Sequence, residues 1–578
     1  MIKIDNLSYS YPQKDLYTDI SFTLEDGQHC AFIGTSGSGK STLIDIIMNP
    51  DQFMFDGKIE KDPNCRIGYV SQFSQLDNTK DITVFEYIAE EFIKLQSELT
   101  AICIEMETSS DLDPLLEKYQ HTLDAFSAIG GDDYERNIHK NLSIANLTKL
   151  ENLMVSKLSG GEFKLVQVIK EMLTSPDLMI MDEPDVFLDF ANLNSLKDLI
   201  NSHKGILLVI THNRYLLNHC FNKIIHLENK QLQEFDGRYI EYNFSLLQTK
   251  IELQELAVAD TLEIERNEAL IDKLRSVATV HTEASRGKSL KARVKIKERL
   301  EARRIKAPFV DIKQPNIDFP IENGIEETIA LKVSNYSVAF DEILLQDVSF
   351  ELNTNEKIAI IGSNGTGKTT LLREIYHNNH NAIEINPITK AAYLSQLQGE
   401  MLNESNTILD EFYDIGFQSN QEIMEYVTTY GFEEDMHQKI EALSGGEKNI
   451  LQLAKIATTK SDLLLLDEPT SHLDTYSQLA LEKALQNYKG AILMISHDFY
   501  TIVNCMDYVL IIEDKTIRKM SIRKFRKMIY ANHFDKDYLE TEQKKKAIET
   551  KIEFALKDND FALARVLSEE LEEIIKSL

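Results

Sequence analysis

Short apolar runs alternate with amphipathic stretches in two separate parts of the chain. Cys30 to Ile33 and Ile358 to Ile361 are strand-sized apolar runs, and helical patterns follow them at Thr42 to Met48 and Thr370 to Tyr376. Short apolar runs bounded by glycine are typical of buried strands. The alternation of strands with helices predicts an α/β fold.

No apolar run approaches the ~18 residues that a membrane-spanning helix needs. The longest runs, such as Gly205 to Ile210, are strand-sized, and residues 1–5 lack the apolar core of a signal peptide. The chain has 578 residues, with 43% hydrophobic and 27% charged residues, which is ordinary globular usage. At about 150 residues per domain we expect three or four units. These properties argue against integral membrane, secreted and disordered proteins.

The cysteines are scattered along the chain and none forms a C-x-x-C pair; they are Cys30, Cys65, Cys103, Cys220 and Cys505. This odd number and wide spacing argue against a disulfide framework or a zinc site. We therefore expect small structural side chains in a protein of the reducing cytoplasm.

A glycine-rich motif occurs twice and fits G-x-x-x-x-G-K-[ST] both times. Its copies, each with the residue after it, are Gly34, Thr35, Ser36, Gly37, Ser38, Gly39, Lys40, Ser41 and Thr42, and Gly362, Ser363, Asn364, Gly365, Thr366, Gly367, Lys368, Thr369 and Thr370. Each copy follows a strand pattern and precedes a helical one, as a phosphate-binding loop requires. Backbone N–H groups of such a loop surround an anion, and the helix N-terminus adds its dipole. We expect Lys40 and Lys368 to contact the β- and γ-phosphates, and Ser41 and Thr369 to hold magnesium.

Further motifs are also paired. Ser159, Gly160, Gly161 and Glu162 match Ser444, Gly445, Gly446 and Glu447, each set preceded by leucine; Asp182 and Glu183 match Asp467 and Glu468; His212 matches His497; and Gln72 matches Gln396. The offset between copies falls from 324 residues at the glutamines to 285 at the serines, so the first copy carries 39 extra residues. We place this insertion at about 86–135 and expect helices at Phe85 to Met106 and Leu112 to Phe126.

These motifs resemble the ATP-binding cassette superfamily over about three quarters of the chain. Two cassettes without a membrane-spanning segment resemble its ABC-F family, whose members are mostly translation factors. The second cassette reads Glu468-Pro469-Thr470-Ser471-His472-Leu473-Asp474, close to the E-P-T-N-H-L-D of that family, and the insertion resembles the family's arm.

The resemblance implies an ATPase that uses ATP and Mg²⁺. Asp182 and Asp467 would reach magnesium, with Gln72 and Gln396 sensing magnesium and water. Glu183 and Glu468 would polarise the attacking water, and His212 and His497 would contact the γ-phosphate. Tyr11 and Phe340 resemble the aromatic platforms that stack on adenine. The cassettes would close head to tail, with Lys40 facing Ser444 and Lys368 facing Ser159.

One loop departs from the family pattern. The first cassette reads Glu183-Pro184-Asp185-Val186-Phe187-Leu188-Asp189, so Asp-Val-Phe replaces T-N-H. Two readings stay open: the first site hydrolyses ATP more slowly because polar contacts across the cassettes are lost, or the replacement is neutral.

The chain is strongly acidic, with a net charge of −31, but one segment is basic. We expect cassettes at 1–242 and 329–534, a linker of two long helices at 243–328, and a helical hairpin at 535–578. Lys and Arg are concentrated in the second linker helix, where the proposed RNA contacts are Arg286, Lys288, Lys291, Arg293, Lys295, Lys297 and Arg299. Such a run is by itself most often a solvated helix face. In the ABC-F family this linker enters the ribosomal E site and touches tRNA and ribosomal RNA, which implies the same partners here.

Several functions remain open. A ribosome-associated ATPase acting on tRNA position in stalled or translating ribosomes is favoured. Within it, a housekeeping factor and an antibiotic-resistance protein are both allowed, and the short linker tip without aromatic residues favours the former. The ATPase subunit of a membrane transporter and a chromosome-type ATPase are alternatives from other classes. The terminal hairpin either makes a further RNA or protein contact or only packs. We expect a monomer whose two cassettes pair within the chain.

Overall fold

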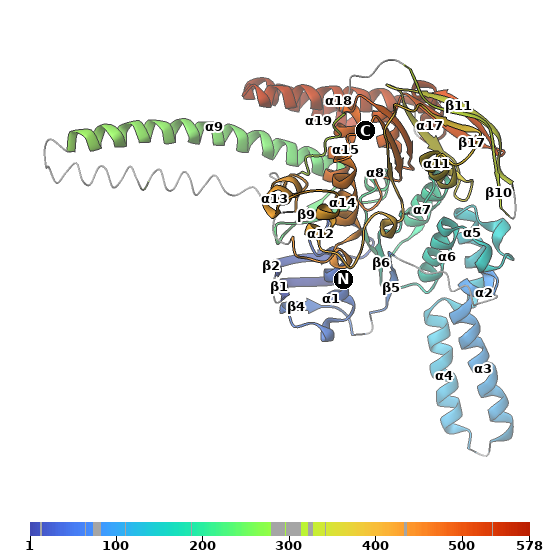
Figure 1. Cartoon of the computed structure of the whole chain (residues 1–578). Helices are drawn as coiled ribbons and strands as arrows, with labels where there is room; N and C mark the ends of the chain where they lie inside the picture. The colour runs from blue at the N-terminus through green and yellow to red at the C-terminus, as the bar shows by residue number, and fades with distance from the viewer. Residues whose placement is uncertain are drawn as a thin grey trace. The chain divides into compact units, whose positions relative to one another are not determined.

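The computed structural model describes the backbone of all residues except 12–13, 64, 73–81, 110, 187, 279–294, 296–313, 322–327, 341–342, 433–435, 534–535 and 578. The chain divides into two compact units. The cassette unit combines Met1–Arg238 with Lys313–Arg526, and the helical unit combines Tyr239–Ile312 with Lys527–Leu578 (Figure 1). None of the helices in the described part of the chain is long and apolar enough to cross a membrane.

The first cassette comprises residues 1–238. Its strands and α-helices, in chain order, are β1 (Ile2–Tyr11), β2 (Lys14–Leu24), β3 (His29–Ile33), α1 (Lys40–Met48), β4 (Asp56–Glu60), β5 (Ile67–Val70), α2 (Val84–Ile88), α3 (Glu90–Thr108), α4 (Asp113–Ala128), α5 (Tyr134–Ile144), α6 (Gly160–Leu173), β6 (Leu178–Asp182), α7 (Phe190–Ser202), β7 (Ile206–Ile210), α8 (Arg214–His219), β8 (Lys223–Glu228) and β9 (Gln231–Asp236).

The second cassette comprises residues 329–526. Its elements are β10 (Ile329–Ala339), β11 (Ile343–Asn353), β12 (Lys357–Ile361), α11 (Lys368–His377), β13 (Ile383–Ile385), β14 (Ala391–Leu394), α12 (Ile408–Asp414), α13 (Asn420–Thr428), α14 (Gly445–Ala457), β15 (Leu463–Asp467), α15 (Thr475–Asn487), β16 (Ala491–Ile495), α16 (Phe499–Cys505), β17 (Tyr508–Glu513), β18 (Thr516–Ser521) and α17 (Ile522–His533), which continues into the helical unit.

The two cassettes share one topology. The order β5-β6-β7-β3-β8-β9 in the first main sheet matches β14-β15-β16-β12-β17-β18 in the second, and only the last strand of each is antiparallel. Strands β6, β7, β15 and β16 are buried along their whole length, as expected for parallel strands covered on both faces. A smaller antiparallel sheet accompanies each, β2-β1-β4 and β11-β10-β13. The predicted α/β fold with two related halves is confirmed.

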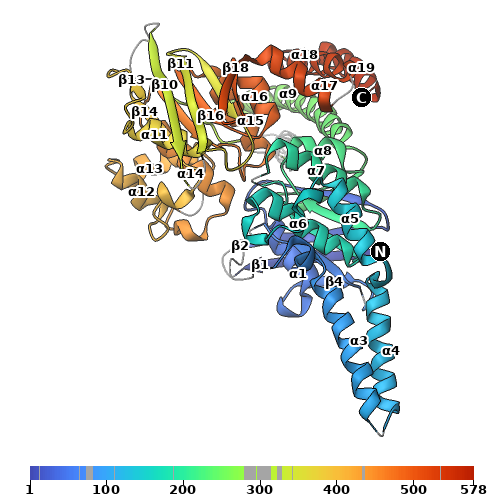
Figure 2. The same ribbon diagram turned by 90° about the vertical axis from the view of Figure 1, so that its right-hand side faces the viewer.

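The insertion in the first cassette is an antiparallel helix pair. Helices α3 and α4 run side by side away from the cassette core (Figure 2). The expected first helix is interrupted at Ala89, so that it forms two helices, α2 and α3. A capping box between Thr83 and Glu86 fixes the start of α2. Phe92 stacks on Tyr134 with ring centroids 4.9 Å apart and joins α3 to α5.

The helical unit is built around its own apolar core. Helices α9 (Tyr239–Ala278), α18 (Lys536–Lys557) and α19 (Phe561–Ser577) contribute buried side chains that include Ile251, Ile552 and Leu571. An ion pair joins Arg565 of α19 to Glu255 of α9. Helices α18 and α19 lie within the expected terminal hairpin, and α9 covers the start of the expected linker. The second linker helix lies outside the described residues, apart from Lys295.

Candidate nucleotide sites

The paired motifs meet at the carboxyl ends of the parallel strands. In the first cassette β3 leads into the loop at Gly34, β6 ends at Asp182, and β7 is followed by His212. Carboxyl ends of parallel strands share one edge of a sheet, where α/β proteins bind their ligands. The second cassette repeats this arrangement with β12, β15 and β16.

Each loop lysine is folded over its own glycine-rich loop. Nζ of Lys40 donates hydrogen bonds of 2.9 Å to the carbonyl oxygens of Gly34 and Thr35. Nζ of Lys368 does the same to Gly362 and Ser363, at 2.7 and 2.8 Å. Burial lowers the pKa of both lysines, while nearby carboxylates oppose this shift. A phosphate group bound in either loop would therefore lie close to a desolvated lysine ammonium group.

A hydroxyl and a carboxylate lie together in each site. Ser41 lies beside Asp182 and Thr369 beside Asp467, close enough for each hydroxyl to affect the pKa of the carboxyl group. Burial raises the pKa of both aspartates to about 6. Hydroxyl and carboxylate oxygens are the protein ligands that Mg²⁺ uses beside substrate phosphates. The donor set fits the expected ion, and a divalent cation would favour the ionised carboxylates.

The glutamate of the first site is held by residues of both cassettes. Its Oε2 accepts a hydrogen bond of 2.6 Å from Nε2 of Gln72 and lies 3.2 Å from Nδ1 of His472. Nδ1 of His472 is also 3.1 Å from Nε2 of Gln72. Burial alone would raise the pKa of Glu183, but the hydrogen bond with His472 and the nearby His212 lower it below its usual value. The carboxylate is therefore ionised and oriented.

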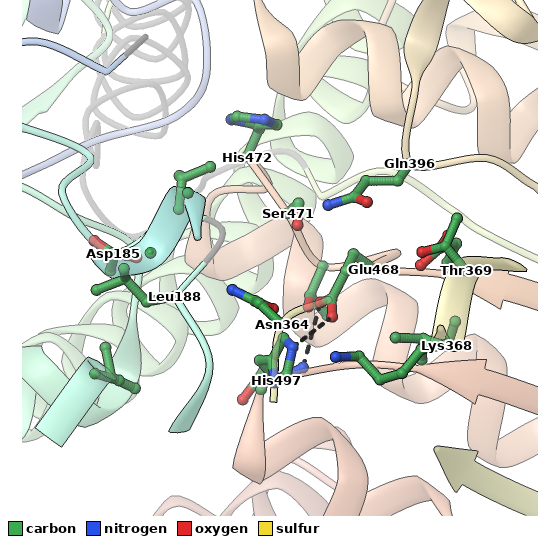
Figure 3. Close-up of a pocket in the computed structure, with 18 of the residues that line it drawn as sticks. Asp185, Leu188, Asn364, Lys368, Thr369, Gln396, Glu468, Ser471, His472 and His497 are labelled. Atoms are coloured by element: carbon green, nitrogen blue, oxygen red, sulfur yellow. Dashed lines mark hydrogen bonds and ion pairs between the residues drawn. The ribbon is translucent and has the colours of Figure 1, made fainter. Parts of the chain in front are cut away.

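The glutamate of the second site has a different environment. Oε2 of Glu468 accepts a hydrogen bond of 3.3 Å from the backbone N–H of His497, whose Nε2 lies 3.5 Å from Oε1 (Figure 3). Burial, together with the negative charge of Asp467, raises the pKa of Glu468 to about 8. Burial also lowers the pKa of His497 to about 4, so this imidazole is neutral at neutral pH. The pKa of the glutamate is therefore lowered in the first site and raised in the second.

Each glycine-rich loop also touches the opposite cassette. The backbone N–H of Ser36 donates 3.0 Å to Oδ2 of Asp474, and that of Asn364 donates 3.3 Å to Oδ2 of Asp189. The backbone of Gly446 approaches Ser36 so closely that a Cβ on Gly446 would collide with the serine side chain. A Cβ on Gly161 would lie 3.4 Å from Nδ2 of Asn364. Both sites are therefore composite, as head-to-tail pairing requires.

A cavity of about 450 Å³ marks the second site. Lys368, Gln396 and Glu468 line it from the second cassette (Figure 3). Gly161 and Val186 line it from the first. Its walls thus join the glycine-rich loop of the second cassette to Gly160 and Gly161 of the first.

The loop that departs from the family pattern belongs to this second site. Asp189 bonds to Asn364, and Val186 and Leu188 line the cavity beside Glu468. Its counterpart in the second cassette brings His472 and Asp474 to the first site. The expectation that attached the departure to the first site was therefore wrong, because each loop crosses to the opposite cassette. The rates themselves stay a prediction.

Sequence reasoning missed two residues that hold the sites. Lys164 of α6 donates hydrogen bonds to the carbonyl oxygens of Ser71 and, at 3.2 Å, Gln72. Glu228, at the end of β8, accepts bonds of 3.1 and 3.0 Å from the backbone N–H and hydroxyl of Thr35. Lys164 lies on α6, which begins at the motif of Ser159, but the second cassette has Asn449 at the corresponding position, so no paired motif marks it. Glu228 belongs to none of the paired sequence motifs.

Two further sets of site residues stay predictions. Tyr11 and Phe340 are exposed, and Tyr11 packs edge-on against Tyr9. Of the basic linker residues, Lys295 is exposed, whereas Arg286, Lys288, Lys291, Arg293, Lys297 and Arg299 lie outside the described residues.

Comparison with known proteins agrees with this geometry. The family model described as ABC transporter matches residues 17–186 and 345–471, about half of the chain. The chain belongs to the ABC transporter family. Domains of this family bind and hydrolyse ATP, which fits the paired loops and carboxylates of both cassettes.

Relatives and solved structures share the tandem arrangement. The ABC transporter F family member 5 of Arabidopsis thaliana is 28% identical over 89% of this chain and 75% of its own. The energy-dependent translational throttle protein EttA of Escherichia coli (strain K12) is 27% identical over 87% and 90%. A crystal structure of archaeal ribosomal stalk protein aP1 with the archaeal ribosome recycling factor aABCE1 matches the fold with a TM-score of 0.53, 16% identity and coverage of 91% and 92%. The resemblance to ABC-F proteins is confirmed.

Proposed function

We propose that the chain is an ATPase that closes its two cassettes around ATP at both composite sites. The reciprocal bonds of Asp474 to the Ser36 N–H and of Asp189 to the Asn364 N–H carry this proposal, because they join each phosphate-binding loop to the opposite cassette. Lys40 and Lys368 would bind the β- and γ-phosphates. Tyr11 and Phe340 would stack on adenine.

Hydrolysis would follow from the residues around each γ-phosphate. Ser41 with Asp182, and Thr369 with Asp467, would hold Mg²⁺, which when bound neutralises phosphate charge. Glu183 and Glu468 would polarise the attacking water, with Gln72 and Gln396 beside them. His212 and His497 would donate to the γ-phosphate.

Nucleotide would then act as a ligand for the closed arrangement. ATP contacts both cassettes only when they are closed, so it favours that arrangement by differential affinity. Loss of the γ-phosphate removes part of that preference, and the cassettes would separate.

We further propose that the closed form binds the ribosome near its E site and acts on tRNA position. Two observations support this proposal. A relative of similar length is a translational throttle protein by name. The basic linker run also contrasts with a net charge of −31, and such a run is suited to RNA phosphates.

Ribosome co-sedimentation tests this function. The Glu183→Gln, Glu468→Gln double variant should bind ATP without hydrolysing it and so remain closed. We expect it to pellet with ribosomes with ATP but not with ADP, and to be released as salt rises. A matched variant in which Arg286, Lys288, Lys291 and Arg293 are changed to Gln should pellet less and show a shallower salt dependence.

Binding that is equal with ATP and ADP would contradict the role of closure. A double variant that stays in the supernatant throughout would overturn the ribosome proposal, and coupling to a membrane partner would replace it.

A further inference from the structure

A buried ion-pair cluster crosses between the cassettes outside the paired sequence motifs, and its residues Arg214 and Asp498 line one wall of the second-site cavity. Arg214 of the first cassette contacts Glu482, Asp498 and Thr501 of the second, and these four residues form the Arg214 cluster. Nη2 of Arg214 lies 3.0 Å from Oδ2 of Asp498 and also bonds to Oε1 of Glu482. The Arg214 side chain is only 11% exposed.

Every charged member of the Arg214 cluster has further partners. Oγ1 of Thr501 lies 3.0 Å from Oε1 of Glu482 and 2.7 Å from Oδ2 of Asp498, so its single hydrogen can be donated to either carboxylate. Asn504 donates 3.0 Å to the other oxygen of Glu482. The guanidinium carbon of Arg214 lies 4.9 Å from the ring centre of Tyr500. Burial opposes the charge on Arg214, but the carboxylates of Asp498 and Glu482 outweigh it and raise its pKa. A buried ion pair whose carboxylates are held in this way favours one geometry, although Nε of Arg214 itself has no hydrogen-bond partner among the described residues.

The cluster connects directly to both sites. Arg214 lies two residues after His212, and Asp498 follows His497. Asp498 also caps α16, since its Oδ1 accepts 2.9 Å from the Tyr500 N–H. A displacement of the segment after either histidine would therefore strain the ion pair between Arg214 and the second cassette.

The equivalent position on the other half of the interface is built differently. The 285-residue offset relates Arg214 to Phe499, Asp498 to Asn213 and Glu482 to Lys197. Phe499 packs on Phe190 with ring centroids 6.2 Å apart. An aromatic contact tolerates small shifts, whereas a guanidinium nitrogen held between two buried carboxylates is fixed in position by charge-assisted hydrogen bonds.

We infer that Arg214 is a positioning residue that couples the two ATP sites, by holding the segments after His212 and His497 in one geometry. This inference rests on the proposed ATP binding at both sites. It predicts that occupancy of one site changes ATP affinity at the other, and that this coupling depends on Arg214.

Equilibrium binding of a fluorescent ATP analogue tests the inference. The Glu183→Gln, Glu468→Gln background stops hydrolysis, and Lys368→Met blocks the second site. With Arg214 present we expect the block to weaken ATP binding at the first site by about tenfold. With Arg214→Gln, which removes the charge, we expect a change below about twofold. Should Arg214→Gln fail to fold, Glu482→Gln removes one of the two carboxylates that hold Nη2 of Arg214 and should reduce the coupling in the same way, which decides the question.

Lys455→Met is the matched control. It breaks a buried ion pair of 2.6 Å with Glu411 inside the second cassette, so it perturbs packing without crossing the interface. In Lys455→Met we expect the block of the second site still to weaken ATP binding at the first site by about tenfold. Equal coupling with and without Arg214 would overturn the inference, as would loss of coupling in the control. Absence of ATP binding in the unblocked protein would instead refute the proposed function.

Discussion

Nδ1 of His472 in the second cassette lies 3.2 Å from Oε2 of Glu183 in the first. The glutamate of the first site therefore depends on a side chain that belongs to the other cassette. At the second site the sequence provides Phe187 where His472 has its counterpart. By sequence, the second site therefore has no histidine at the position that corresponds to His472.

Substitution of His472 should impair the first site selectively. In the Glu468→Gln background, which leaves only the first site active, we expect His472→Phe to lower ATP turnover by about 10- to 100-fold, the effect of losing one hydrogen bond to a charged group. Phosphate release measures this rate. In the Glu183→Gln background the same substitution should change turnover by less than about twofold. Equal losses in both backgrounds would refute the assignment.

The reciprocal substitution should improve the second site. In the Glu183→Gln background we expect Phe187→His to raise turnover at least about threefold, because it supplies an imidazole that can hold Glu468 ionised. Phe187→Leu is the control for loss of the aromatic ring and should give no gain. A decrease of turnover with Phe187→His would contradict this prediction and show that the second site works better with phenylalanine than with histidine at position 187.

Lys164 should act on the first site through Gln72. Its Nζ holds the carbonyl oxygens of Ser71 and Gln72, so we expect Lys164→Met to release this strand end and lower kcat/KM about 10-fold in the Glu468→Gln background. Lys170→Met is the control, since Lys170 lies on the same helix and bonds to Glu90 instead. Comparable losses in the two variants would indicate a general effect on α6.

The helical unit should lose stability when its core is truncated. Ile552 is fully buried between α9, α18 and α19, so we expect Ile552→Ala to reduce the unfolding free energy of this unit by about 2–4 kcal/mol. Phe554→Ala should change it by about 0.5 kcal/mol or less, because Phe554 is 61% exposed. Amide hydrogen exchange of the helical unit measures the unfolding free energy in both variants. Faster exchange in α9 as well as α18 is expected, and faster exchange confined to α18 would contradict a shared core.

The repeated motifs made the fold and most site residues accessible from the sequence. Loop glycines, acids after buried strands and the histidines after β7 and β16 are local features with fixed spacing. Contacts between cassettes are not local: Arg214 and Glu482 are 268 residues apart, and no periodicity relates them. The same limit applies to the loop that departs from the family pattern. Only the paired arrangement shows that Val186, Leu188 and Asp189 lie at the second site.

The shared core of α9 with α18 and α19 has a consequence for synthesis of the protein. Ile251 leaves the ribosome early, but its partner Ile552 follows about 300 residues later. At ~5–20 residues per second this delay is about 15–60 s. During that time the second cassette is made and can fold, while the apolar stripe of α9 stays uncovered. Nascent chains should therefore recruit chaperones at this helix until the hairpin emerges.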